Sequence, residues 1–291
     1  MHLDYAEERP TGRLADIVRC AWTLRGGEAG AGDGEPQPVL PDGCVELVFN
    51  LAAPFRQRLR DGTVVTQPLH MVVGPASGPT VITPSGAVDI IGVRLHPWTV
   101  SVLGVHAAAL RDRCMPLREV APTLAERCAH ALATAMADAP VARVAALLGA
   151  FGEATAAYVP DVRLAAVVAR CDAGGEWPGM GAMGRELGFG VRALERLFAA
   201  HVGLPPKTLV QILRVQRAIA EVRRNPHRTW AAVAASAGYV DQSHLVREMR
   251  RFAGLKPTAL EDEARRLTRV FLAPVGGGTA TRAVELGGSR R

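Results

Sequence analysis

Lysine, paired cysteines and long apolar runs are scarce or absent in this sequence, and each absence narrows the class of protein. Of the 34 basic residues in the 291-residue chain, only Lys207 and Lys256 are lysine. No stretch approaches the ~20 apolar residues that a membrane span needs. The lack of any Cys-x-x-Cys pair argues against a disulfide framework or a structural zinc and favours a reducing compartment; the cysteines are Cys20, Cys44, Cys114, Cys128 and Cys171.

The remaining composition is that of a folded protein of about two domains. Hydrophobic residues make up 48% and charged residues 21% of the chain. This apolar content offsets chain entropy and excludes a disordered or fibrous protein. The first eight residues are acidic and do not have the basic, then apolar layout of a signal peptide. We therefore expect a cytoplasmic location and no association with a membrane.

Charge is distributed unevenly along the chain. Residues 1–160 hold 13 basic and 16 acidic side chains, a net charge of −3, whereas residues 161–269 hold 18 and 11, a net charge of +7. A basic second half behind a mildly acidic first half is typical of a protein in which only one domain meets a polyanion. A compositional bias toward arginine is the alternative, and composition alone does not decide between the two.

The first 95 residues are predicted to be rich in β-strands. Apolar and polar residues alternate over residues 18–25, a period of two that suits a half-buried strand. Residues 45–51 and 88–95 are further apolar runs rich in β-branched side chains. Turn signals containing Gly, Pro and Asp separate these runs, so the pattern predicts a small barrel or sandwich.

From Pro97 onward the pattern is helical. Pro97 suits a first helical turn, and apolar residues recur at helical spacing over 124–136 and 141–151. A boundary is predicted at residues 153–161. Residues 274–291 are rich in Gly, Thr and Arg and have no periodic apolar face, which predicts a disordered tail.

The second half contains an internal repeat. At a shift of 51 residues Leu194 superposes on Leu245, Arg196 on Arg247, and Gly203-Leu204 on Gly254-Leu255. Further upstream the shift is 50, so the second copy has one extra residue in its turn. Each copy is predicted as two short helices around a glycine, over 180–187 with 191–201, and over 230–237 with 242–252. This is the geometry of a helix-turn-helix, whose second helix enters a DNA major groove.

The exposed face of each second helix carries the side chains that could contact bases. Arginine can bond guanine O6 and N7, and glutamine can bond adenine N6 and N7. A carboxylate on such a face can accept from cytosine N4 or orient a neighbouring arginine. The residues on these faces are Arg192, Glu195 and Arg196 in the first copy, and Gln242, Ser243, His244, Val246, Arg247 and Arg250 in the second. Solvated charges on ordinary amphipathic hairpins are the alternative, which two copies in phase disfavour.

A single helix over residues 208–224 is predicted between the copies. It spans ~25 Å and could hold two recognition helices on one DNA face, about 34 Å apart per turn. Its basic residues, and the two lysines that flank the repeat units, are candidates for phosphate contacts: Arg214, Arg217, Arg223, Arg224, Lys207 and Lys256.

These residues resemble the DNA-binding domain of AraC/XylS-type bacterial transcription regulators. The resemblance lies in residues 183–188, 194–198 and 203–207 of the first copy, and in residues 237–252 and 254–257 of the second. It implies base contacts by Arg192, Glu195, Arg196, Gln242, Ser243, His244 and Arg247. We also expect phosphate contacts by Lys207, Thr229, Trp230, Arg250, Arg251 and Lys256. Glu195 departs from the family pattern, in which a neutral or basic residue is common.

The N-terminal half is similar to a β-rich domain of unassigned function that precedes this DNA-binding domain in many bacterial regulators. Residues 40–50 and 92–97 carry the resemblance. It implies a sensor or dimerisation module, and we expect a pocket for a small effector that includes Trp22, Cys44, Glu46, Phe49 and His96.

Other chemistry is disfavoured by the spacing of the residues that would carry it. His70, His96, Cys44, Glu46 and Asp89 match no compact metal motif, so neither a metal nor a cofactor is expected. Cys44 follows a turn and could be reactive, although a buried inert thiol is the preferred interpretation. Residues 179–184 form a Gly-x-Gly-x-x-Gly run, but no strand precedes it.

The sequence thus predicts an α+β protein in three parts. Residues 1–157 form a β-rich barrel or sandwich with a helical end, 158–273 form an all-α double helix-turn-helix domain with a linker helix, and 274–291 form a tail. The expected function is sequence-specific DNA binding by a regulator of transcription, not an enzyme, with a small effector, a homodimer and RNA polymerase as possible partners. The alternatives are an enzyme or alkyl acceptor tethered to DNA, and a DNA-binding dimer without a ligand.

Overall fold

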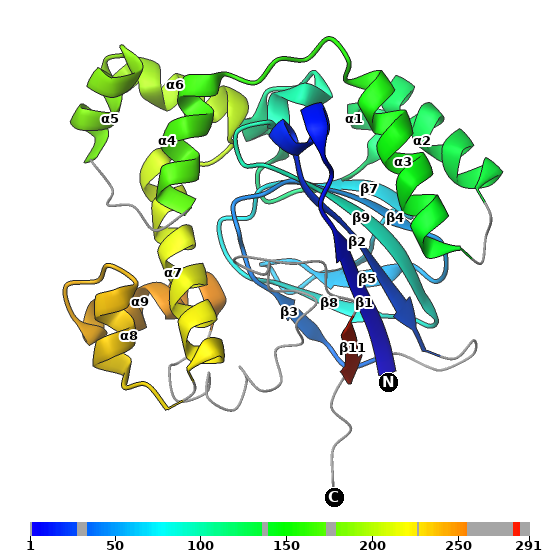
Figure 1. Ribbon diagram of the computed structural model, residues 1–291. Helices are drawn as coiled ribbons and strands as arrows, with labels where there is room; N and C mark the ends of the chain where they lie inside the picture. Colours follow the sequence, from blue (N-terminus) through cyan, green and yellow to red (C-terminus); the bar gives the residue numbers. More distant parts are fainter. Residues whose placement is uncertain are drawn as a thin grey trace, which may run out of the picture.

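The computed structural model describes residues 2–27, 34–135, 139–172, 179–225, 227–254 and 282–285. In the N-terminal half two antiparallel sheets face each other without closing into a barrel (Figure 1). The first sheet has the order β10-β7-β4-β9-β2-β1-β11 and the second the order β3-β8-β5-β6. The strands are β1 His2–Glu8, β2 Val18–Gly26, β3 Gln37–Val39, β4 Glu46–Asn50, β5 Phe55–Arg58, β6 Val64–Thr66, β7 His70–Val73, β8 Thr80–Pro84, β9 Val88–Leu95, β10 Cys114–Pro116 and β11 Arg282–Glu285.

The first sheet is buried on both faces. One face packs with Phe49 and Val93 against apolar side chains of α2 and α3, and the other packs with Val48 and Ile90 against the second sheet. The three strands that the sequence predicts coincide with β2, β4 and β9. The half-buried strand expected over residues 18–25 is instead mostly buried, because helices cover the face that a sandwich would leave to solvent. The helices of this half are η1 Gly12–Asp16, η2 Val100–Leu103, η3 Ala107–Leu110, α1 Leu117–Val120, α2 Pro122–Thr134 and α3 Pro140–Ala154.

The C-terminal half is helical and lies beside the two sheets (Figure 1). One helical hairpin lies at each end of the long helix α7, which connects them. Every helix predicted in the repeat is present, and α4 is an additional helix whose first turn is capped by Asp161 Oδ1. The helices are α4 Val162–Asp172, α5 Gly179–Leu187, α6 Val191–His201, α7 Pro206–Arg224, α8 Trp230–Ser236 and α9 Gln242–Ala253.

The repeat predicted from the sequence is reproduced in the hydrogen bonds of the two turns. Gly188 and Gly238 end their helices with φ of +73° and +80°, a left-handed conformation that glycine adopts without a steric penalty. The next residue then donates back to the preceding helix, Phe189 N to Gly184 O at 2.7 Å and Tyr239 N to Ala234 O at 2.9 Å. The same turn geometry therefore occurs twice, 50 residues apart.

Most of the predicted tail lies outside the described residues. The four residues that are described form β11, which pairs antiparallel with β1 at the edge of the first sheet. The disordered tail predicted for residues 274–291 differs from the structure at these positions. Pairing of this kind uses main-chain groups and requires no side-chain periodicity. Among the described residues, no helix is long and apolar enough to cross a membrane.

The N-cap of α9 provides a test of the second helical hairpin. Asp241 Oδ1 accepts a hydrogen bond from His244 N at 2.7 Å. Replacing Asp241 with Ala should lower the free energy of unfolding by about 1 kcal/mol, because the backbone N–H loses its acceptor. Chemical denaturation measures this change. Asp241→Asn is the matched control and should retain most of the stability; an equal loss in both variants would contradict a capping role.

Candidate nucleic-acid interface and ligand cavity

The second helix of each hairpin presents charged side chains to solvent. On α6, Arg192, Glu195 and Arg196 are exposed, and on α9, Gln242, Ser243 and Arg247 are exposed. None of the arginines in this set forms an ion pair with a described residue. The opposite faces of the two helices are buried through Leu194 and Phe198, and through Leu245, Met249 and Phe252. Each helix is thus fixed by its apolar side and leaves its polar side accessible.

A buried carboxylate holds α9 in place. Glu248 is 5% exposed and accepts hydrogen bonds from Gln211 Nε2 on α7 at 2.7 Å and from Tyr239 OH at 2.9 Å. The ring of His244 contacts the same carboxylate at 3.3 Å and packs edge-on against Tyr239. Because Nε2 of His244 is directed at Glu248, a base contact by this ring would use Nδ1.

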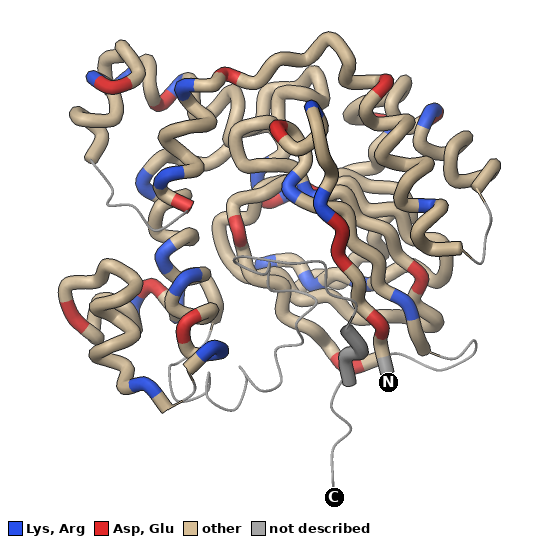
Figure 2. The backbone as a smooth tube through the Cα atoms, in the orientation of Figure 1, with Lys and Arg blue, Asp and Glu red and all other residues tan. Residues whose placement is uncertain are grey.

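Basic residues also lie along α7 and on the helices at its ends (Figure 2). Lys207, Arg250 and Arg251 are exposed. Thr229 is exposed and caps α8 by accepting from Ala232 N at 3.3 Å, and Trp230 is half-buried. Lys256 lies outside the described residues.

Several of the arginines predicted along the connecting helix have protein partners instead. Arg224 pairs with Glu221 at 3.1 Å, and Arg214 lies 5.9 Å from the centre of the Tyr239 ring. Burial lowers the pKa of Arg217, whose Nε donates to Leu213 O at 3.4 Å. These contacts leave the exposed residues on α6 and α9 as the stronger candidates for DNA contacts.

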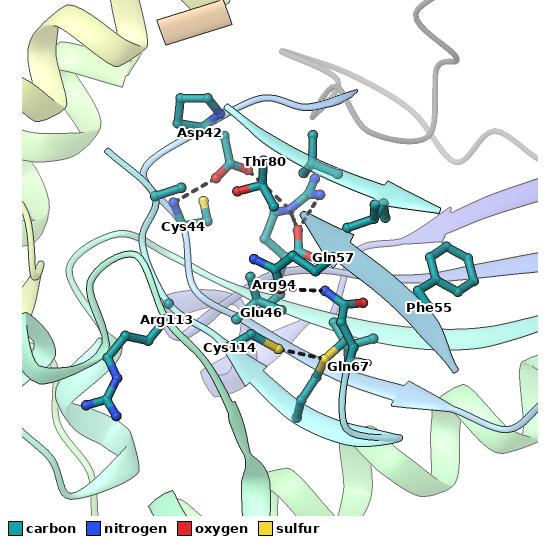
Figure 3. A pocket seen from close by; sticks show the side chains of 18 of the residues that line it. Asp42, Cys44, Glu46, Phe55, Gln57, Gln67, Thr80, Arg94, Arg113 and Cys114 are labelled. Atoms are coloured by element: carbon teal, nitrogen blue, oxygen red, sulfur yellow. Dashed lines mark hydrogen bonds and ion pairs between the residues drawn. The ribbon is translucent and has the colours of Figure 1, made fainter. Parts of the chain in front are cut away.

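A cavity of about 130 Å³ lies between the two sheets of the N-terminal half. Its polar centre is Arg94 on β9, which is 5% exposed. The guanidinium contacts Glu46 Oε1 through Nε at 2.6 Å and Nη2 at 2.5 Å, and Asp42 Oδ2 through Nε at 3.3 Å (Figure 3). Gln67 Nε2 donates to Gln57 Oε1 at 3.1 Å on the wall formed by the second sheet. Apolar walls complete the cavity, among them Trp22, Val48, Phe55, Met71, Ile82 and Ile90.

Two segments that line the cavity also contact the C-terminal half. In residues 40–44, Pro41 O accepts a hydrogen bond from Gln216 Nε2 of α7 at 2.6 Å. Gly43 packs so closely on Leu209 that a methyl group at Gly43 would overlap the leucine side chain. Leu40 belongs to the same apolar cluster as α7. This side of the cavity is therefore continuous with the helix that connects the two hairpins.

The second segment, residues 74–80, lies close to the glycines that follow α6 and α9. Gly203 follows α6 and Gly254 follows α9, and both have positive φ. A methyl group at Gly203 would lie 2.7 Å from Pro75 Cγ, and one at Gly254 would lie 3.5 Å from Pro79 Cγ. Gly203 and Gly254 superpose in the sequence repeat. One short segment therefore lies next to the same position of both hairpins.

Two family models match separate parts of the chain. Residues 183–263 match the family model of a helix-turn-helix domain, and residues 6–116 match a domain of unknown function, DUF6597. The C-terminal half carries an AraC-type helix-turn-helix domain. No curated protein matches the chain in a sequence search.

Solved structures with a similar arrangement are distant from this chain. ToxT from Vibrio cholerae is 8% identical with a TM-score of 0.46, and the match covers 87% of this chain and 98% of ToxT. The transcriptional regulator CdpR from Pseudomonas aeruginosa is 18% identical with a TM-score of 0.30, over 62% and 46% of the chains. The AraC-like transcriptional activator CuxR is 13% identical with a TM-score of 0.31, over 72% and 79%. All these scores lie below 0.5, so the assignment of the AraC-type domain rests on the family model and the repeat.

Only some of the residues that the sequence analysis assigns to an effector pocket line the cavity between the two sheets. Trp22, Cys44 and Glu46 line it, whereas Phe49 and His96 do not. Phe49 lies on the other face of β4, because side chains of a strand alternate, and is buried in the cluster under α2 and α3. His96 follows the end of β9, where it stacks on Trp98 with ring centres 4.4 Å apart and its Nε2 lies 3.0 Å from Ala15 O.

Sequence reasoning missed Arg94, the central residue of the cavity. An arginine inside the apolar run over residues 88–95 was the available signal, since an unpaired charge is rarely buried. No group of three or more metal-ligating side chains is present in the part of the chain that the structure describes.

Burial of Cys44 predicts a low thiol reactivity. Burial raises the pKa of Cys44 well above its usual value, so at mildly alkaline pH the side chain stays a thiol and the nucleophilic thiolate is scarce. Iodoacetamide should label Cys44 in denatured protein but not in folded protein, as measured by mass spectrometry of the peptide. Labelling of folded Cys44 at the rate of a free thiol would support the alternative of a reactive cysteine.

Proposed function

We propose that this protein is a sequence-specific DNA-binding regulator of transcription that responds to a small effector bound between its two sheets. The repeated helix-turn-helix, with the same turn hydrogen bonds in both copies and polar faces exposed on α6 and α9, is the observation that carries the proposal. Helix α7 has 19 residues and is about 28 Å long. This length is compatible with two recognition helices in successive major-groove segments, whose centres are about 34 Å apart.

The proposed base contacts are those of the exposed faces: Arg192, Glu195 and Arg196 on α6, and Gln242, Ser243, His244 and Arg247 on α9. The proposed phosphate contacts are Lys207, Thr229, Trp230, Arg250, Arg251 and Lys256. In this interpretation the arginines read guanine edges, and Glu195 orients its arginine neighbours or accepts from cytosine.

The response to an effector would pass through the two segments that border the cavity. Residues 40–44 contact α7, and residues 74–80 lie close to the glycines that follow α6 and α9. A ligand that stabilises one position of these segments more than another changes the population of arrangements available to the hairpins. Direct coupling of this kind favours a regulator over a DNA-binding dimer without a ligand.

Selection of bound duplexes from random DNA, with the full chain, tests the proposal. The enriched sequences should contain two conserved segments whose centres are about 10 base pairs apart, because each recognition helix reads one major-groove segment. Enrichment of no sequence, or of a single short segment, would contradict the proposed two-site recognition.

Arg247 is expected to read a base. Arg247→Ala should weaken binding to the selected sequence by about 1–3 kcal/mol and relax the preference at one base step. Fluorescence anisotropy with single-base variants of the selected duplex measures both effects. Arg118→Ala, which removes an exposed arginine of α1, is the control. Equal weakening on all duplexes would make Arg247 a phosphate contact.

Lys207 is expected to contact phosphate and not bases. Lys207→Ala should lower the slope of log Kd against log salt concentration by about one unit and leave sequence preference unchanged, because one counterion fewer is released. A salt titration of the same anisotropy assay gives the slope. An unchanged slope would place Lys207 outside the interface.

A further inference from the structure

We propose that the cavity between the two sheets binds a small organic cation with a flat apolar body, such as an aromatic amine or amidine. The proposal rests on the proposed function, since it names the chemical class of the effector for the same cavity. Three features of the cavity support it: its charge, the shape of its floor and its size.

The interior of the cavity has an excess of negative charge. Asp42 and Glu46 share a single cation, Arg94. The other charged groups nearby are already engaged or point elsewhere. Asp112 at the rim pairs with Arg60 at 3.2 Å, and Arg113 extends away from the cluster (Figure 3). Arg19, beside Cys44, attracts Asp42 but forms its ion pair with Asp172 of α4 at 3.1 Å, so Arg94 and Arg19 together face three carboxylates. Counted over the residues that the structure describes, one carboxylate charge is therefore uncompensated among apolar walls, where electrostatic interactions are screened least.

The environment of Glu46 agrees with this charge count. Burial raises the pKa of Glu46 and the like charge of Asp42 raises it further, although Arg94 lowers it, so the protein alone stabilises the ionised carboxylate incompletely. A ligand cation beside Glu46 or Asp42 would supply the missing positive charge. A ligand carboxylate would instead place a third negative charge beside the guanidinium of Arg94, which already pairs with Asp42 and Glu46.

The floor of the cavity is an aromatic platform. Trp22 on β2 lies opposite Gly92 on β9, and a methyl group at Gly92 would overlap three atoms of the indole. The absence of a side chain at Gly92 thus makes room for the indole against the strand, where Trp22 lines the cavity. Indole faces attract cations and stack on planar groups. The indole N–H of Trp22 lies close enough to Glu46 to lower the pKa of that carboxyl, so the platform borders the carboxylate that the cation would reach.

The size of the cavity limits the ligand. Its volume of about 130 Å³ is close to that of an apolar cavity of about 150 Å³ that holds one benzene molecule. One ring with a short polar group therefore fits the enclosed space.

Isothermal titration calorimetry with three probes of equal shape and different charge tests the proposal. Benzylamine, benzyl alcohol and benzoate are titrated into the full chain at fixed ionic strength. Benzylamine should bind about tenfold or more tightly than benzyl alcohol, because only the cation gains the uncompensated carboxylate and the indole face, and benzoate should bind weakest. Benzoate or the alcohol binding as tightly as the amine, or no binding by any probe up to its solubility limit, would overturn the proposal.

Variants locate the site of binding. Glu46→Gln should abolish the preference for benzylamine over benzyl alcohol, while Glu153→Gln should leave it intact, because Glu153 is an exposed carboxylate on α3, on the other side of the first sheet. An unchanged preference in Glu46→Gln would also overturn the proposal. Circular dichroism checks that each variant is folded. If Glu46→Gln does not fold, Asp42→Asn takes its place, and the ranking of the three probes on the natural chain decides independently.

The two proposals can fail separately. Duplex selection without any ligand tests DNA recognition alone. Recognition of a two-segment site together with no preference for the amine would reject the ligand class and leave the regulator intact. A preference for the amine without any DNA recognition would reject the proposed function and retain the cation site.

Discussion

The buried guanidinium of Arg94 is the interaction on which the N-terminal half depends. It joins β9 to β4 through Glu46 and joins both strands to residues 40–44 through Asp42. A buried charge that loses its partner destabilises a protein by about 3–5 kcal/mol, so this cluster constrains the strands and the segment together. The same three side chains set the charge of the cavity, and the segment that they hold contacts the helix between the two hairpins. The arrangement of the strands, the charge of the cavity and the contact of residues 40–44 with α7 therefore all depend on Arg94, Glu46 and Asp42.

The C-terminal half depends on a different constraint, the left-handed glycines. Gly188 and Gly238 turn the chain inside the hairpins, and Gly203 and Gly254 end the recognition helices. Any other residue at these positions carries a steric cost, and at Gly203 a side chain would also collide with Ala107 and Pro75. The repeat is visible in the sequence because the backbone requires the same residue at equivalent points.

The sequence predicted the C-terminal half more completely than the cavity, and the reason is physical. A helix-turn-helix is built from neighbouring residues, so its caps, glycines and apolar stripes are all local signals; Asp241 and Gly238 are examples. The cavity is made by residues far apart in the sequence, such as Trp22 and Arg94, which meet only when β2 pairs with β9. The alternation of side chains along β4 could have excluded Phe49 from the predicted pocket, since Glu46 and Val48 point to the opposite face of the strand. No sequence pattern, in contrast, indicates that the ring of His96 stacks on Trp98 two residues away, or that residues 282–285 pair with the edge of the first sheet.

The position of residues 74–80 has a consequence for the two hairpins. Pro75 and Pro79 belong to one short segment, yet they lie close to the glycines that follow two helices separated by 40 residues of chain. Under the proposed function, an effector that shifts this segment would therefore act on both hairpins together and not on one hairpin alone.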